Sequence, residues 1–322
     1  MTRPPDFDPG PLERELLGGE RRYTRLEVAE LSGVPIERCT EFWHALGFAD
    51  VDDDACAFTD RDVWAVKTVT ALGDAGWLPE DMQVSMARAL GQSLSRLADW
   101  QLGTISGMFD PASAPNEAMR RAEELVPVVE QLIGYVWRRH LAAAAGRLLA
   151  ASGDEFAAGT VAVGFADLVG FTSLTREIDE EELADLVERF EGLASNIVAM
   201  GGGRVIKTIG DEVLFVADDV ATAAEIGTSL AEQVPQHPSL PELRVGMAYG
   251  TVLSRLGDVY GEPVNIAARL TSIARPGSVL VDREFAEAID GNAAWRLRRV
   301  PPRPVRGYAL LQPLRLRRAD SS

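Results

Sequence analysis

The chain has 322 residues, of which 46% are hydrophobic and 25% charged. The composition is that of a globular protein, and the length favours two domains because one core rarely grows beyond about 250–300 residues. Its 32 basic and 49 acidic side chains give a net charge of −17, which argues against general affinity for nucleic acid because phosphate contacts need clustered cations.

The sequence also indicates the cellular compartment in which the protein is expected. Two cysteines cannot build a disulfide framework. No apolar run approaches the roughly 20 residues that span a bilayer, so we expect no transmembrane segment. No signal peptide is visible in the first residues, which contain Pro, Asp and Glu in place of an apolar stretch. We therefore expect a cytoplasmic protein.

Three segments are expected along the chain. Residues 1–20 read as a disordered arm rich in Pro and Asp, residues 21–150 as an all-α domain, and residues 151–322 as an α+β domain. The boundary is placed in the polar, glycine-containing stretch 151–159, after which the hydrophobic pattern changes from helical to alternating.

Short helices are expected within residues 23–78. Thr24 followed three residues later by Glu27 is a capping box. The order of helix, tight turn, helix, short loop and helix is that of a winged helix-turn-helix, and this stretch resembles the MerR-like helical module. Further along, Pro127 is expected to start or kink a linker helix near residues 128–150.

The second half predicts a ferredoxin-like fold. Its expected elements have the order β-α-β-β-α-β with C-terminal additions, which is the split βαβ arrangement. In chain order they are a strand at 161–165, a helix from Asp179 to Gly201, a hairpin of strands 204–209 and 213–216, a helix at 220–233, a strand at 243–249, a helix at 264–274 and a strand at 278–281.

Two aspartates stand where this fold brings its chain segments together. Asp167 ends the first strand, and Asp211 lies in the hairpin turn, which the fold places beside that strand end. Two adjacent carboxylates repel unless a cation lies between them, and Mg²⁺ and Mn²⁺ prefer such oxygen ligands. Taken singly, each residue is also explained as an ordinary capping or turn aspartate.

Other polar residues add to this pattern. Lys207 is one of only two lysines, with Lys67, in a chain that otherwise uses arginine. Asn265 and Arg269 are four residues apart and share one helix face, which suits a ribose oxygen and a developing charge on phosphorus. The alternatives are a solvated edge-strand lysine, and a capping amide beside a surface arginine.

Together these residues resemble the catalytic domain of class III nucleotidyl cyclases over about residues 161–316. The matching strings are GFADLVGFT at 164–172, KTIGDE at 207–212 and GDVYGEPVNIAAR at 257–269. The resemblance implies conversion of ATP to 3′,5′-cyclic AMP and pyrophosphate. It also implies a head-to-tail homodimer in which each site uses residues of both subunits.

The resemblance assigns a role to each matched residue. Asp167 and Asp211, helped by the carbonyl of Leu168, would hold two divalent cations, Mg²⁺ or Mn²⁺. Asn265 would orient the ribose, and Arg269 would stabilise the pentavalent phosphorane. The backbone of Val169, Gly170, Phe171 and Thr172 would cradle the phosphates, Arg306 would replace the lysine that usually holds the triphosphate, and Arg255 is a second candidate for the pyrophosphate.

The same resemblance assigns base recognition to Lys207 and Asp258. Lysine is a pure donor that suits N1 of adenine, and aspartate is a pure acceptor that suits the 6-amino group. Guanine presents a donor at N1 and a carbonyl at position 6, so both groups would be left unpaired. We therefore expect ATP as the substrate.

Residues 20–150 also resemble the helical regulatory domain of soluble mycobacterial-type adenylyl cyclases, most clearly in the string YVWRRHL at 135–141. This implies an autoinhibitory or pH-responsive role, with His140 as the titrating group, although an exposed helix histidine is an equal alternative. Some relatives accommodate fatty acids here, so a fatty-acid or membrane-surface ligand is a further expectation.

Two other classes of function stay open from the sequence. One is a DNA-binding regulator with a nucleotide-sensing module, but acidic residues such as Glu37 and Glu41 in the expected recognition helix would repel phosphate. The other is a catalytically silent module that binds ATP, which the complete set of expected catalytic positions argues against.

Overall fold

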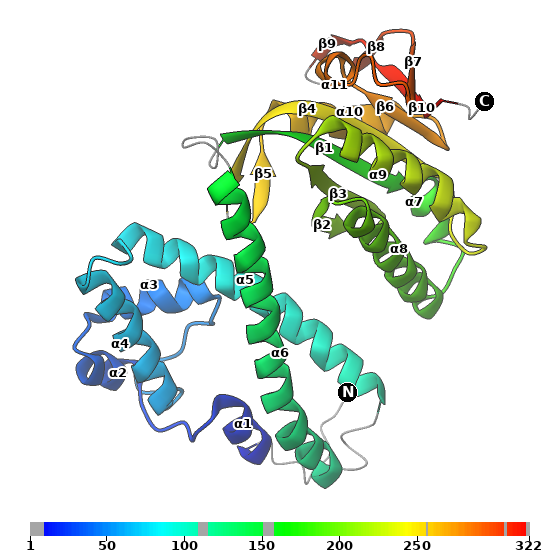
Figure 1. The fold of residues 1–322 in the computed structure, drawn as a ribbon. Helices are drawn as coiled ribbons and strands as arrows, with labels where there is room; N and C mark the ends of the chain where they lie inside the picture. Colours follow the sequence, from blue (N-terminus) through cyan, green and yellow to red (C-terminus); the bar gives the residue numbers. More distant parts are fainter. Residues whose placement is uncertain (1–9, 109–114, 151–157, 256, 306–307, 320–322) are drawn as a thin grey trace. The chain divides into compact units, whose positions relative to one another are not determined.

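The computed structural model describes residues 10–108, 115–150, 158–255, 257–305 and 308–319 (Figure 1). The chain divides into two compact units, residues 1–146 and 147–322. Within the described residues, no helix combines the length and apolar character needed to cross a membrane. Residues 1–9 of the expected disordered arm lie outside the described residues, but its remainder is partly ordered, because Gly10–Leu17 forms helix α1.

The N-terminal unit is helical where it is described. Its helices are α1 (Gly10–Leu17), α2 (Arg25–Ser32), α3 (Ile36–Leu46), α4 (Asp60–Asp74), α5 (Glu80–Met108) and α6 (Pro115–Ala150), the last of which crosses the boundary between the units. The capping box is confirmed: the Thr24 hydroxyl accepts from the Glu27 N–H, and the Glu27 carboxylate accepts from the Thr24 N–H. Both cysteines are free.

The first helices enclose a small core. Val28, Cys39 and Val66 are buried in it, and the rings of Trp43 and Phe58 stack with centroids 4.4 Å apart. Burial in this core raises the pKa of the Cys39 thiol.

The linker helix differs from the expectation near residues 128–150. It begins at Pro115, and Pro127 lies inside it. Proline fits the first turn of a helix because the N–H it lacks has no partner there. At Pro127 the missing N–H costs one hydrogen bond, and the helix nevertheless continues on both sides.

The C-terminal unit is an eight-stranded sheet with strand order β2-β3-β1-β4-β6-β10-β7, and β5 pairs with β4 off this path. Its central strands β4-β1-β3-β2 pair antiparallel as in a ferredoxin-like fold, which confirms the expected fold class. The strands of this sheet are β1 (Ala158–Leu168), β2 (Arg204–Ile209), β3 (Glu212–Ala217), β4 (Leu243–Arg255), β5 (Asp258–Tyr260), β6 (Ser278–Val281), β7 (Trp295–Arg299) and β10 (Leu314–Arg318). Two further strands, β8 (Arg303–Val305) and β9 (Tyr308–Leu311), pair with each other in a separate sheet. The helical elements of this unit are α7 (Phe171–Leu174), α8 (Glu180–Met200), α9 (Val220–Gln233), the 3₁₀ turn η2 (Val234–Gln236), α10 (Glu262–Ile273) and α11 (Arg283–Ala288).

Strand β4 is longer than the expected 243–249. It runs to Arg255 because β1 pairs with it over the full stretch Ala158–Leu168, and β5 then pairs with its final residues. The short strand β5 is not among the elements expected from the sequence.

The two faces of the sheet are covered differently. Helices α8 and α9 pack on one face, where Phe190, Ile226 and Phe215 form the main core. Helix α10 packs on the other face (Figure 1). It lies so close that a Cβ on Gly246 would come within 2.3 Å of the Thr271 backbone nitrogen. We refer to this second side as the α10 face. Asp167 on β1, Glu212 on β3 and Arg244 on β4 project to it, because their neighbours along each strand belong to the main core.

Candidate active site

The two expected carboxylates meet at one end of the sheet. Asp167 lies at the end of β1 and is 8% exposed. Asp211 lies in the β2–β3 turn, where Gly210 has a φ of 63°, a left-handed conformation that glycine adopts without strain. The Leu168 N–H donates to the Asp211 carbonyl at 3.0 Å, which fixes the turn against the strand end.

Burial and neighbouring charges raise the pKa of two carboxyl groups at this end of the sheet, Asp211 and Glu212. The pKa of Asp211 is raised, first by burial and then by the charge of Asp167 and a hydrogen bond with it, against the lowering effects of its own backbone hydrogen bond and of Arg244. Burial, followed by the charges of Asp167 and Asp211, raises the pKa of Glu212 to about 7. Glu212 is the cross-strand partner of Asp167, so three carboxyl groups share this end of the sheet.

A cation that the sequence analysis did not single out lies among them. Arg244 on β4 is the other cross-strand partner of Asp167. Its guanidinium donates to Asp167 Oδ2 at 2.5 Å and to the Ser272 carbonyl at 3.5 Å. The sequence did hold a signal for it, because Arg244 is the only charged residue in the otherwise apolar strand stretch 243–249.

The donor set fits a hard divalent cation. Among the described residues, no group of three or more His, Cys, Asp or Glu side chains is arranged to hold a metal. Asp167 and Asp211 nevertheless supply two adjacent carboxylates whose mutual repulsion favours a cation between them. Such oxygen ligands match Mg²⁺ or Mn²⁺, which usually complete their coordination with substrate phosphates and water.

The structure brings the two expected base-reading residues together. Lys207 Nζ donates to Asp258 Oδ2 at 2.5 Å, and their side chains are 40% and 25% exposed. The other carboxylate oxygen of Asp258 accepts from the Val259 N–H at 2.8 Å. The pair therefore joins β2 to β5 and leaves polar atoms facing outward.

A β-bulge gives Lys207 its direction. Val205 lies opposite Phe215, but the register shifts after it, so that Lys207 lies opposite Leu214. Phe215 belongs to the core under α8 and α9, whereas Leu214 belongs to the α10 face. Without the extra residue, strand alternation would aim Lys207 toward the same side as Val205. The bulge thus turns the lysine to the α10 face, and its Nζ reaches Asp258 on β5.

Asn265 and Arg269 lie on the outer side of α10. Both are exposed, while Ala267 and Leu270 of the same helix are buried against the sheet. Within the part of the chain that the structure describes, neither side chain makes a hydrogen bond to another residue. They are free to meet a ligand or a second protein chain.

Only some of the groups expected to contact the phosphates are placed near the carboxylates with a free donor. The Val169 N–H already donates to the Glu242 carbonyl at 2.9 Å, so only Gly170, Phe171 and Thr172 keep backbone donors for an anion. Gly170, with a φ of 78°, turns the chain into α7. Arg255 lies at the opposite end of β4 from Arg244, so one subunit does not bring it to the carboxylates. Arg306 lies outside the described residues.

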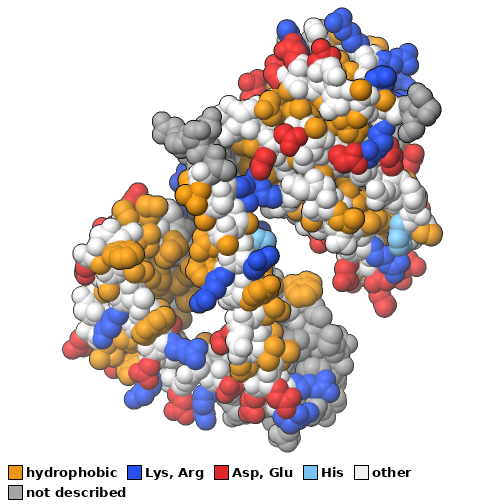
Figure 2. Space-filling model, in the orientation of Figure 1, with side chains coloured by type: hydrophobic (Ala, Val, Ile, Leu, Met, Phe, Trp, Pro, Cys, Tyr) orange, Lys and Arg blue, Asp and Glu red, His pale blue; other side chains and the backbone are white. Residues whose placement is uncertain are grey.

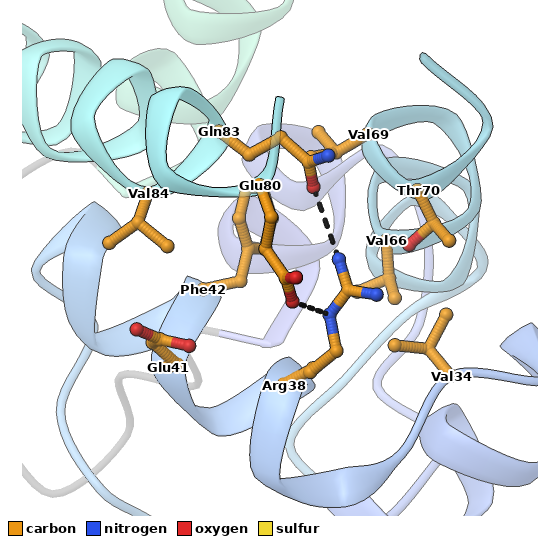
Figure 3. Close-up of a pocket in the computed structure, with 10 residues that line it drawn as sticks. All are labelled: Val34, Arg38, Glu41, Phe42, Val66, Val69, Thr70, Glu80, Gln83 and Val84. Carbon is orange, nitrogen blue, oxygen red and sulfur yellow. Dashed lines mark hydrogen bonds and ion pairs between the residues drawn. The ribbon is translucent and has the colours of Figure 1, made fainter. Parts of the chain in front are cut away.

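The N-terminal unit contains a small cavity of about 30 Å³ (Figure 3). Arg38 lies across it and contacts Glu80 at 3.0 Å and Gln83 at 3.4 Å. This volume is about the share of one water molecule in the liquid, so this cavity does not support the expected fatty-acid ligand. His140 lies on the exposed surface of α6.

This sheet, with its paired aspartates and lysine–aspartate pair, defines a class III nucleotidyl cyclase catalytic domain. Residues 155–312 match the model of the adenylate and guanylate cyclase catalytic domain family. The chain is 44% identical to an adenylate cyclase of Streptomyces coelicolor over 98% of this chain and 93% of that protein. It is 34% identical to a pH-sensitive adenylate cyclase of Mycobacterium tuberculosis over 86% and 72%.

The likeness also extends to solved structures. An adenylyl cyclase from P. aeruginosa is 24% identical, with a TM-score of 0.45 over 51% of this chain and 96% of that one. On the sequence relationships, the chain belongs to the adenylate cyclases and is an enzyme.

Proposed function

We propose that this chain converts ATP to 3′,5′-cyclic AMP and pyrophosphate at sites shared by two copies of the chain. The observation that carries the proposal is the Lys207–Asp258 pair, which lies in the same unit as the adjacent carboxylates Asp167 and Asp211. The most direct test is formation of cyclic AMP by the full chain from ATP with Mn²⁺, with GTP as the competing substrate.

The paired side chains account for the choice of adenine. On base binding, Lys207 donates to N1 and Asp258 accepts from the 6-amino group. With guanine, donor meets donor and acceptor meets acceptor, which leaves partly buried polar groups unpaired at a cost of about 1–3 kcal/mol each. The short mutual contact of the pair keeps both groups satisfied until the base arrives.

The phosphate end of the site uses the carboxylates. Asp167, Asp211 and the Leu168 carbonyl would hold the divalent cations. Bound there, such cations lower the pKa of the ribose 3′-hydroxyl and neutralise charge on the phosphates. Arg244 is fixed against Asp167 and lies at the same end of the sheet, where its guanidinium can also contact the triphosphate. Backbone N–H groups after Gly170 complete the cradle.

The exposed face of α10 supplies the remaining roles. Asn265 orients the ribose, and Arg269 stabilises the charge that develops on the α-phosphorus during in-line attack. Because both side chains point outward without a partner among the described residues, we place them in the site of a second copy bound head to tail. Each dimer then has two equivalent sites.

Complementation tests this arrangement. Homodimers of Asp211→Asn or of Arg269→Gln have a defect in both sites, whereas a mixed dimer has one intact site. Random exchange at equal concentrations makes half of the dimers mixed, so about a quarter of the wild-type cyclase activity should return. A mixture that stays as inactive as its components, although subunits exchange, would contradict the shared site.

We also propose that the N-terminal unit makes the activity depend on pH through His140. The support is the resemblance of this unit to that of the pH-sensitive M. tuberculosis relative. His140→Ala should flatten the pH–activity profile of the full chain. His237→Ala is the matched control, since His237 bonds Ser239 in the catalytic unit. His44→Ala tests the third histidine, whose ring contacts the Asp50 carboxylate at 3.0 Å. Superimposable profiles for His140→Ala and the wild type would end this proposal.

A further inference from the structure

Besides the cavity in the N-terminal unit, a hollow lies in the catalytic unit, on the α10 face, and has a volume of about 250 Å³. Four arginines line it, Arg275, Arg298, Arg299 and Arg315, together with apolar side chains such as Leu280. None of the described residues that line it is acidic, although the whole chain carries a net charge of −17. Figure 2 shows basic side chains gathered at the end of this unit that β7 and β10 form.

Strand register brings the arginines together. Arg315 on β10 lies between Leu280 on β6 and Arg298 on β7 as their cross-strand partner. Cross-strand partners project from the same face of a sheet. Arg275 lies two residues after the end of α10 and also lines the hollow. The guanidinium groups of three separate segments thus share one space.

The fold leaves this charge uncompensated. Burial, followed by the charges of Arg317, Arg275 and Arg298, lowers the pKa of Arg315. Its Nε is buried and has no hydrogen-bond partner. Among the described residues, no ion pair joins Arg275, Arg298 or Arg315 to an acidic side chain. Grouped like charges and an unpaired buried donor both cost free energy, and an anion in the hollow would remove both costs.

We propose that this hollow is a binding site for a phosphate-bearing molecule. Guanidinium groups pair with phosphate oxygens through two parallel hydrogen bonds, and several converging arginines match the multiple charges of a phosphate better than the single charge of a carboxylate. The apolar side chains, among them Leu280 and Val300, accommodate an organic part. The hollow is lined mainly from β6, β7, β10, the end of α10 and the segment after it, and none of its lining residues is among those assigned to the candidate active site, so the two sites are separate.

Calorimetric titration of the full chain with sodium tripolyphosphate tests the proposal. EDTA is present, so that the carboxylates of the active site hold no metal. The variant R298Q/R315Q should raise the Kd at least tenfold. The matched control R189Q/R283Q also loses two charges, from exposed i,i+4 ion pairs outside the hollow, and should bind like the wild type. R275Q, which changes an exposed side chain, should raise the Kd by three- to tenfold.

Stability and the source of the phosphate are measured on the same variants. Because R298Q/R315Q relieves repulsion, it should unfold without ligand at or above the wild-type temperature. Sedimentation with phosphatidylglycerol vesicles distinguishes the sources: loss of vesicle binding in R298Q/R315Q identifies a lipid headgroup, and tripolyphosphate binding alone identifies a soluble ligand. Equal Kd values in wild type, R298Q/R315Q and R275Q, or binding of neither probe by the wild type, would overturn the proposal.

Discussion

Arg244 offers the sharpest test of the charge balance in the active site. It lies against Asp167, whose neighbours Asp211 and Glu212 both have a raised pKa. Replacing the guanidinium by an amide, as in Arg244→Gln, leaves three carboxyl groups at one end of the sheet without their adjacent cation. We expect a less stable catalytic unit, and we expect a divalent cation to restore much of the loss.

The expected loss of stability depends on how deeply the Arg244–Asp167 ion pair is buried. The side chains of Arg244 and Asp167 are 35% and 12% exposed. Exposed pairs contribute about 0–1 kcal/mol, and removing one partner of a fully buried pair costs about 3–5 kcal/mol, so about 2 kcal/mol is expected for this intermediate case. In a unit of this size, 1 kcal/mol shifts the unfolding midpoint by about 2–4 °C. Arg244→Gln should therefore unfold about 4–8 °C below the wild type in EDTA.

Differential scanning calorimetry of the full chain measures this shift. The transition of the catalytic unit is the one that rises when Mn²⁺ and a non-hydrolysable ATP analogue are added. Mn²⁺ alone should reduce the gap between Arg244→Gln and the wild type by at least half. Arg204→Gln removes a more exposed pair with Asp218 and should shift the midpoint by less than about 2 °C. An Arg244→Gln midpoint equal to that of the wild type in EDTA, or a gap that Mn²⁺ leaves unchanged, would refute the reasoning.

Two further predictions concern base choice and pH. Lys207→Met removes a charge-assisted hydrogen bond worth about 1.5–3 kcal/mol. We therefore expect kcat/KM for ATP to fall about 10- to 150-fold and the ratio of kcat/KM for ATP to that for GTP to become smaller. Lys67→Met, which changes the other lysine of the chain, should leave both quantities unchanged. Burial raises the pKa of Asp282 to about 7, so the folded state keeps a proton that the unfolded state loses between about pH 4 and 7, and stability falls by about 4 kcal/mol as pH rises through that window. Asp282→Asn keeps an oxygen for the N–H groups of Tyr249 and Phe285. In urea unfolding it should lose about 3 kcal/mol less stability than the wild type between pH 5 and pH 8; the fall that remains is expected from Glu212, whose pKa is also raised to about 7. An unchanged pH slope would contradict the prediction.

Local signals in the sequence were enough to predict much of the fold. The capping box at Thr24 and the N-cap at Asp179 depend on residues within one helical turn, so a single sequence contains all the information they need. The same holds for the helix Val220–Gln233, whose observed bounds equal the expected ones. The ferredoxin-like order follows from the succession of such elements.

The features that orient the side chains of the candidate active site depend on residues that are distant in the sequence. The bulge after Val205 is a feature of the pairing of β2 with β3, and it turns Lys207 to the α10 face. No residue near Val205 in the sequence indicates that an extra residue is inserted there. The contact of Arg244 with Asp167 joins strands whose residues are 77 positions apart. Of the two roles expected for Pro127, to start or to kink the linker helix, the first is excluded, because the helix begins at Pro115 and includes Pro127.

Helix α10 connects the two sites physically. Asn265 and Arg269 lie on its exposed side, and its Ala267 and Thr271 lie so close to Gly246 that no side chain would fit there. The helix ends at Ile273, two residues before Arg275. Arg244 is tied to the same helix through the Ser272 carbonyl. A phosphate held by Arg275 and Arg315 would therefore restrain the C-terminal end of the helix that also bears the candidate catalytic residues Asn265 and Arg269.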